Sequence, residues 1–101
     1  MHPELGLTEK AWFRYLLSKN NYTCAVTGER GCRLSVHHLY SVCSRPELRW
    51  DESNVVVVRE DIHKKFHIEH MGGFSVPCRP DDFKEFLATR VAPAGRNTTG
   101  T

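Results

Sequence analysis

The stretch that decides the fold is Leu-Ser-Val-His-His at residues 34–38, followed after a polar segment by Asn-Val-Val-Val-Val-Arg-Glu-Asp-Ile-His-Lys-Lys-Phe-His at residues 54–67. Residues 34–38 alternate with the period of two that is typical of a strand with two different faces. His37 and His38 therefore point to opposite faces of that strand. Residues 55–58 are four consecutive valines, which predicts a buried strand. The polar residues 41–53 between the two strands are predicted to form a loop.

Residues 60–70 continue this order with a predicted helix. They contain no Gly or Pro, carry acidic residues in the first turn, and place apolar residues at one-turn spacing. On such a helix His63 and His67 also stand one turn apart, beside the apolar stripe, where two imidazoles can share one metal ion. The His37-His38 pair is the source of a third ligand, and the other ring of that pair stays free beside the metal. A free imidazole with an ordinary pKa of about 6.5 suits a general base in hydrolysis.

Further helices flank this core. Thr8 precedes an apolar-rich stretch and predicts an N-capped helix over residues 8–20, and Pro80 opens a last helix over residues 80–90. Residues 22–26 are predicted as a short strand. We therefore expect one α+β domain over residues 1–91, with its core at residues 22–70, a packing helix on each side, and a flexible tail at residues 92–101.

The composition limits the class of protein. The chain has 101 residues, a formal net charge of +2 and six histidines. Residues 1–50 carry seven Lys/Arg against four Glu, whereas residues 51–101 carry seven against eight acidic residues, so the front half suits a polyanionic partner. No apolar run reaches the roughly 18 residues of a membrane span, and the start lacks the features of a secretory leader. We expect a soluble, cytoplasmic protein whose four cysteines are buried free thiols.

The order of His37-His38, Asn54, His63 and His67 on strand, strand and helix resembles the HNH or ββα-metal nucleases, also called His-Me finger nucleases. The doubled histidine with His-x-x-x-His is similar to the DNase domains of colicins. The wider stretch is similar to the small HNH endonucleases of phages and mobile introns. The resemblance covers about residues 22–90 and implies a ββα-metal core with a packing helix at each end.

The resemblance also implies a role for each motif residue. His37, His63 and His67 would bind one divalent metal ion, and His38 would be the general base. Asn54 would brace the loop and hold the ring of His38 through a hydrogen bond. The reaction would be metal-dependent hydrolysis of DNA phosphodiester bonds, giving a 5′-phosphate and a 3′-hydroxyl. Imidazole ligands favour Zn²⁺ or Ni²⁺ in binding strength, while Mg²⁺ or Mn²⁺ would support activity.

The implied partner is double-stranded DNA. Arg45 and Arg49 in the loop, and Lys64 and Lys65 on the metal helix, are candidates for phosphate contacts. One such site cuts one strand at a time, so the chain would nick as a monomer and cut both strands as a homodimer. The resemblance places such an enzyme in the cytoplasm of a bacterium or a phage-infected cell, as a phage or homing-type endonuclease.

The sequence departs from relatives that carry a zinc ribbon. Cys24 stands where a first ligand would, but Thr27 occupies the partner position, and Arg59 and Ile62 occupy the second pair. The alternative function is a non-catalytic, zinc-stabilised DNA-binding module, in which Cys32 or Cys43 adds a fourth ligand to the histidines. A structural zinc site is closed, whereas an enzyme keeps one coordination position open.

Overall fold

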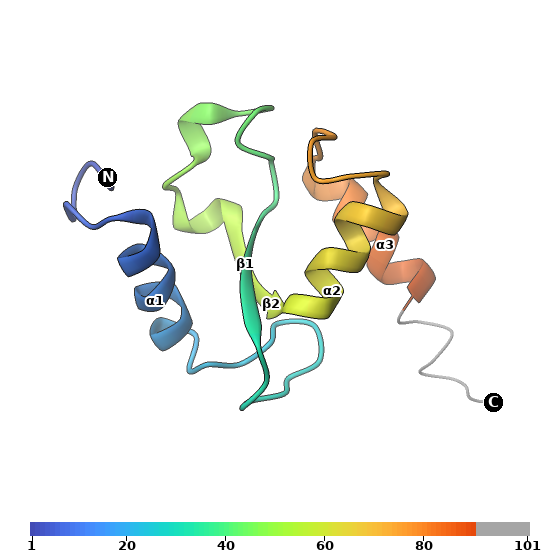
Figure 1. Ribbon diagram of the computed structural model, residues 1–101, viewed down its shortest axis with the longest axis horizontal. Coiled ribbons are helices and arrows are strands. Elements are labelled where there is room, and N and C mark those ends of the chain that lie inside the picture. Colours follow the sequence, from blue (N-terminus) through green and yellow to red (C-terminus); the bar gives the residue numbers. More distant parts are fainter. Residues whose placement is uncertain (91–101) are drawn as a thin grey trace.

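The fold is organised around an antiparallel hairpin, which lies at the centre of Figure 1. The computed structural model describes residues 1–90, where the elements are, in chain order, α1 (Glu9–Lys19), β1 (Leu34–His38), two short 3₁₀ helices (Pro46–Leu48 and Glu52–Asn54) within the predicted loop, β2 (Val55–Arg59), α2 (Glu60–Lys65), a π-turn (Phe66–His70) and α3 (Pro80–Arg90). The predicted α+β class is confirmed, together with the two strands and the helices that flank them. None of the helices in this part of the chain is long and apolar enough to cross a membrane.

The register of the hairpin fixes which side chains share a face. Val36 lies opposite Val57, and His37 lies opposite Val56. Because successive side chains of a strand point to opposite faces, Val36 and Val57 face one side while His37 and Val56 face the other. The valine run is therefore buried on both sides, as predicted from its composition.

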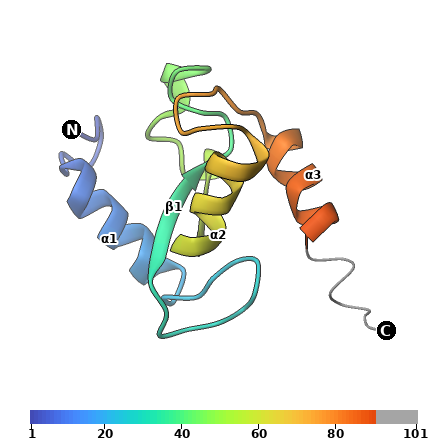
Figure 2. The same cartoon turned by 45° about the vertical axis from the view of Figure 1, so that its right-hand side comes forward.

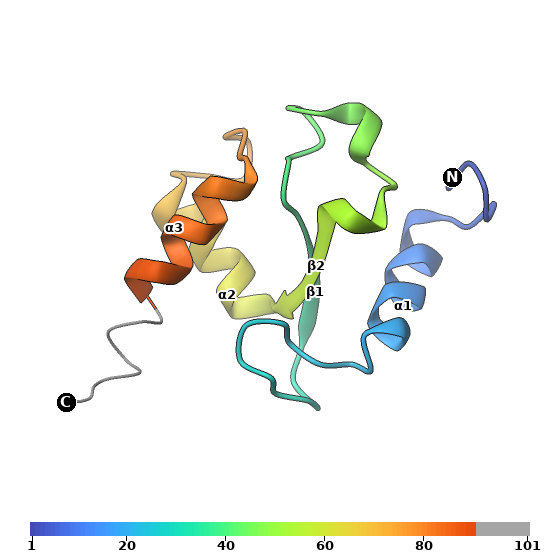
Figure 3. The same cartoon turned by 180° about the vertical axis from the view of Figure 1, so that it is seen from behind.

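Each face of the hairpin carries its own hydrophobic core (Figures 1 and 3). On one face, α1 packs Trp12 and Leu16 against Val36 and Val57. On the other face, α2 and α3 cover the hairpin with a larger cluster made of Cys24, Val58, Ile62, Phe66, Cys78, Phe83 and Phe86. The hairpin thus forms the middle layer of a three-layer arrangement, and His37 and His38 point into different halves of the molecule.

The helix termini follow from local chemistry. The hydroxyl of Thr8 accepts a hydrogen bond from the backbone N–H of Ala11 at 3.2 Å and caps α1. Pro80 begins α3, where its fixed φ and missing N–H do no harm, and the Asp82 carboxylate accepts from the backbone N–H of Arg79 at 2.9 Å. These caps explain why the two flanking helices begin where the sequence predicts.

Two predicted elements differ in the structure. The strand predicted at residues 22–26 is wrong, because only a single bridge pairs Thr23 with Arg30. Asn21, just before it, and Tyr22, its first residue, adopt φ of 56° and 51°, which interrupts an extended chain. The helix predicted at residues 60–70 is α-helical only to Lys65 and continues as a π-turn over Phe66–His70, closed by a hydrogen bond from Met71 N–H to the Phe66 carbonyl at 2.9 Å.

The cysteines are free thiols, as predicted, but not all of them are buried. Cys24 and Cys78 lie in the core, Cys32 is half-buried and Cys43 is exposed. The tail predicted at residues 92–101 lies outside the described residues.

Candidate metal centre

Three of the predicted metal ligands meet on one face of the hairpin. His37 reaches across from β1, His63 comes from α2, and His67 from the π-turn that continues α2. One ligand nitrogen from each ring can be chosen so that all three lie within 4.8 Å of one another. The His63 and His67 ring centres are 4.7 Å apart, as expected for residues one turn apart on a helix. This group can hold a metal ion.

The burial of these rings tests whether a cation fits. His37 is fully buried and His67 is 8% exposed. Both nitrogens of His37 and the Nδ1 of His67 are buried and have no hydrogen-bond partner within the described part of the chain. A buried polar atom without a partner costs about 1–3 kcal/mol. A cation held by the three rings would occupy ligand nitrogens of His37 and His67 that the described part of the protein leaves unpaired, so the donor set fits a metal ion.

The electrostatics of the group keep its rings neutral. Burial, and then the charges of His63, His67 and His38, lower the pKa of His37 from 6.5 to about 3. Burial and the charges of His67 and His38 lower the pKa of His63 to about 4, and burial lowers the pKa of His67. Neutral imidazole is the form that ligates a metal, so the site is in its binding form at neutral pH.

Aromatic rings enclose the three histidines. Phe83 lies 4.4 Å from the His37 ring, and Phe66 lies 5.1 Å from it, both measured between ring centres. Phe74 stacks on His67 at 4.7 Å with an angle of 23° between the rings. The buried rings of Phe66 and Phe83 restrict the orientation of the His37 imidazole. The sequence patterns did not single out Phe74, for which the clue is its place directly after Gly72-Gly73 and near the last histidine ligand.

His38 lies on the opposite face of the hairpin, as the strand alternation predicts. Its half-buried ring is 6.3 Å from that of Trp12 of α1. The ring Nε2 lies 2.9 Å from the backbone carbonyl of Arg49, and because a carbonyl only accepts, Nε2 must donate. In the neutral ring this leaves Nδ1 as the proton acceptor. Burial is the main cause that lowers the pKa of His38.

Asn54 braces the loop but does not hold the ring of His38, which corrects one prediction. Its Oδ1 accepts from the backbone N–H of Tyr40 at 2.8 Å, and its Nδ2 donates to the carbonyls of Tyr40 and Leu48 at 3.1 and 3.3 Å. The His38 ring is bonded to the Arg49 carbonyl instead. Asn54 therefore ties together the two ends of the loop that carries Arg49.

Three of the four cations predicted to contact phosphates already have carboxylate partners. Arg45 pairs with Glu47 at 2.6 Å, Arg49 with Glu9 at 2.7 Å, and Lys64 with Glu60 at 3.6 Å. No ion pair of Lys65 is found among residues 1–90, and its side chain is exposed. Exposed ion pairs contribute only about 0–1 kcal/mol, so a phosphate could replace these carboxylates at little cost.

The thiols predicted as alternative zinc ligands do not join the histidines. Within residues 1–90 the potential metal-binding group contains His37, His63 and His67 and neither Cys32 nor Cys43. His70 is also outside the group and packs against Phe66 and Phe86. Residues 1–90 therefore offer three ligands to this site, which leaves at least one coordination position open.

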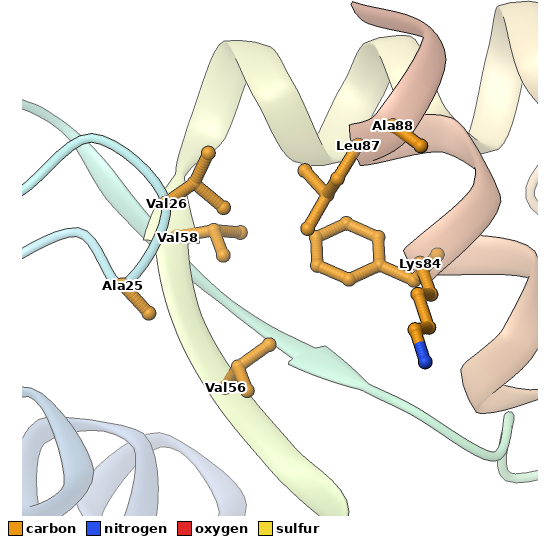
Figure 4. A pocket seen from close by; sticks show the side chains of 8 residues that line it. Ala25, Val26, Val56, Val58, Lys84, Leu87 and Ala88 are labelled. Atoms are coloured by element: carbon orange, nitrogen blue, oxygen red, sulfur yellow. The ribbon is translucent and has the colours of Figure 1, made fainter. Parts of the chain in front are cut away.

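A separate apolar groove lies between the hairpin and α3 (Figure 4). Its volume is about 580 Å³, and its lining consists of Ala25, Val26, Val56, Val58, Phe83, Lys84, Leu87 and Ala88. Apart from the Lys84 ammonium, this lining holds no group for acid–base or metal chemistry. The groove is therefore not the candidate site, although Phe83 belongs to both.

No family model, curated protein or solved structure matches this chain.

Proposed function

We propose that this chain is a metal-dependent DNA endonuclease built on a ββα-metal core. The observation that carries the proposal is the convergence of three neutral imidazoles from β1 and the helix after β2, with a fourth, unligated imidazole on the next residue of β1. A structural metal site has no evident need for the fourth ring. A hydrolytic site needs a base within reach of the phosphate at its metal, and His38, although it points to the other face of the hairpin, is near enough for its charge to lower the pKa of His63.

His37, His63 and His67 would hold a divalent cation, which when bound would offset the negative charge that develops on a phosphodiester during hydrolysis. His38 supplies the base. With Nε2 committed to the Arg49 carbonyl, its Nδ1 takes a proton from a water molecule whose oxygen attacks phosphorus. The bond to the 3′-oxygen breaks, and that oxygen takes a proton from a second solvent water to become the 3′-hydroxyl, while the phosphate stays on the 5′-oxygen of the other fragment. The lowered pKa keeps His38 unprotonated and ready at neutral pH.

Supercoiled plasmid tests this proposal. Purified protein with Mg²⁺, Mn²⁺, Zn²⁺ or Ni²⁺ is expected to convert the plasmid to open circles, since one site cuts one strand. His38→Ala should lower the rate about 10²- to 10⁴-fold, the usual contribution of a general base. His63→Ala should abolish both cleavage and metal binding.

His70→Ala is the matched control, because His70 follows the ligands on the same helical segment but stays outside their group. It is expected to cleave like the wild type. Absence of cleavage with every metal would favour the non-catalytic zinc module. Equal rates for His38→Ala and the wild type would remove His38 from the mechanism.

A further inference from the structure

An exposed aromatic ring stands at the edge of the metal centre. Phe74 is 55% exposed, stacks on His67, and meets His63 edge-on at 5.9 Å with an angle of 88°. One face of the ring is therefore used by a ligand imidazole, while the exposed part of the ring faces solvent. The site as proposed above assigns no role to this side chain.

The fold does not need the Phe74 ring for its cores. Phe74 belongs to neither hydrophobic cluster of residues 1–90 and is not among the half-buried side chains packed against them. The loop that carries it passes over the end of the α2 segment (Figure 2) and is held by backbone bonds. Gly73 N–H donates to the His67 carbonyl at 2.6 Å, and Ser41 N–H donates to the Cys78 carbonyl at 3.0 Å.

The glycines before the ring explain how the loop presents it. Gly72 and Gly73 adopt φ of 90° and 146°, a region that side chains rarely enter. They turn the chain back at the end of the π-turn, so that the next residue, Phe74, lies over His67. The turn thus places an apolar side chain beside the metal ligands, where it stays exposed, although burying this side chain in a hydrophobic core would be more favourable.

We propose that Phe74 is a stacking platform for the nucleobase next to the scissile phosphate, and that the substrate is DNA with an unpaired base at the cut. The inference rests on the proposed nuclease function and narrows its substrate. A base stacks on an aromatic ring whatever its identity. Bases inside a duplex are already stacked and paired, so only a strand that is single or locally open can offer one at low cost.

The charges around the site agree with such a substrate. Binding to duplex DNA rests largely on cations that contact phosphates. Here Arg45, Arg49 and Lys64 can exchange their carboxylate partners for phosphates, but the freed carboxylates stay on the same surface, and the whole chain has a net charge of only +2. Base stacking supplies an attraction that this weakly basic surface does not.

One oligonucleotide sequence, offered as a single strand, as a perfect duplex and as a duplex with a mismatched bubble, tests the proposal. The wild type is expected to cut the single strand and the bubble faster than the perfect duplex. Phe74→Ala should lower kcat/KM on the single strand about 5- to 150-fold, the usual effect of losing one stacked base. Phe74→Trp should keep the wild-type rate, and Phe74→Leu, which is apolar but not planar, should behave like the alanine variant.

Substrate changes separate stacking from a structural role. After the cut is mapped, an abasic nucleotide beside it should slow the wild type and leave Phe74→Ala unaffected, because the variant has already lost the contact. Metal affinity, measured by Ni²⁺ titration, should be the same in both proteins. Tyr22→Ala, which removes an aromatic ring 51% exposed and outside the metal centre, is the matched control and should cleave like the wild type.

Three results would overturn the inference. Wild-type rates for both Phe74→Ala and Phe74→Leu would remove any role for the ring in the substrate complex. A wild-type rate for Phe74→Leu together with reduced metal affinity in Phe74→Ala would make the side chain an apolar cover for His67. No cleavage by the wild type with any metal would remove the nuclease function and this inference with it, whereas the first two results leave the nuclease function standing.

Discussion

His37 and His38 are consecutive residues with different surroundings, because a strand sends neighbours to opposite faces. His37 enters the core beneath α2 and α3 and is fully buried. His38 lies under α1, half-buried, with one nitrogen bonded to a carbonyl. Histidine can therefore serve as a metal ligand at position 37 and as a general base at position 38, because the alternation of the strand gives the two rings different surroundings.

The burial of His37 predicts that the metal-free protein loses stability in acid. The pKa of His37 is about 3 in the folded state and about 6.5 in the unfolded chain. Between pH 6.5 and pH 3 the unfolded state therefore binds a proton on His37 that the folded state does not bind. The stabilisation is complete above pH 6.5 and is lost as the pH falls toward 3. Between pH 7 and pH 5, His37 alone should lower the free energy of unfolding by about 2 kcal/mol.

Urea unfolding in the presence of a chelator measures this loss. His37→Phe keeps a planar ring in the core but cannot be protonated, so its stability should fall less than that of the wild type over the same pH range. The loss that remains in the variant comes from other groups, including His63, whose pKa is also lowered. An identical pH dependence in the two proteins would show that His37 is not buried in its neutral form.

Among the elements, the loop between the strands depends on one amide. Asn54 is buried, and its side chain makes three hydrogen bonds to backbone groups of Tyr40 and Leu48. Asn54→Ala leaves these groups without their partner and should lower the free energy of unfolding by about 2–4 kcal/mol. Cleavage should fall as well, since the Arg49 carbonyl that fixes His38 belongs to this loop.

Urea unfolding measures the loss of stability, and plasmid nicking measures the loss of cleavage. Two further substitutions, one at Asn54 and one at its neighbour Ser53, serve as comparisons. Asn54→Asp keeps an acceptor for Tyr40 N–H but turns a buried carboxylate oxygen toward the two carbonyls, so it should be no more stable than the alanine variant. Ser53→Ala removes a hydroxyl that bonds only Asp51 on the surface and should cost less than about 1 kcal/mol. Unchanged stability in Asn54→Ala would mean that the loop does not rely on these bonds.

The elements show what the sequence could and could not predict. Periodicity identified β1 and the three α-helices, because their apolar residues repeat with the spacing of the backbone, and the run of four valines identified β2 by its composition. The π-turn was not predictable, since residues 66–70 carry neither Gly nor Pro and the extra residue in the turn has no sequence mark. The strand predicted at residues 22–26 failed because propensity does not reveal that Asn21 and Tyr22 turn the chain.

The candidate site likewise has a part that the sequence could predict and a part that it could not. The spacing of His63 and His67 on a helix and the alternation of His37 and His38 on a strand bring the ligands together, and both follow from local geometry. The Arg49 carbonyl and the ring of Phe74 come from loops, whose paths depend on contacts between distant segments. No local pattern predicts such contacts.

In the molecule as a whole, two small cores lie on the two faces of one hairpin, and the metal centre belongs to only one of them. A bound cation would tie β1 to the helix after β2 on the α2–α3 side. Metal should therefore stabilise the whole chain, by about 2.7 kcal/mol when the free ion is at 100 times its Kd. Chains of this size bury a limited core, so such an increment is a large part of their stability.

Two core substitutions test on which face of the hairpin the bound metal adds stability. Trp12→Ala damages the α1 side and should lower the free energy of unfolding by about 3–5 kcal/mol, while the gain on adding Zn²⁺ or Ni²⁺ stays at the wild-type value, because the two sites share no side chain. Phe66→Ala should lower the free energy of unfolding by a similar amount and should also reduce the stabilisation gained on adding metal. The Phe66 ring packs on the rings of His37 and His67, with ring centres 5.1 and 5.0 Å apart. Urea unfolding with and without metal measures, for each variant, the loss of stability and the gain on adding metal. His63→Ala is the control and should show no gain. Equal gains in the two core variants would mean that the cation does not sit among these three histidines, because a metal held elsewhere would not respond to the loss of the ring that supports them.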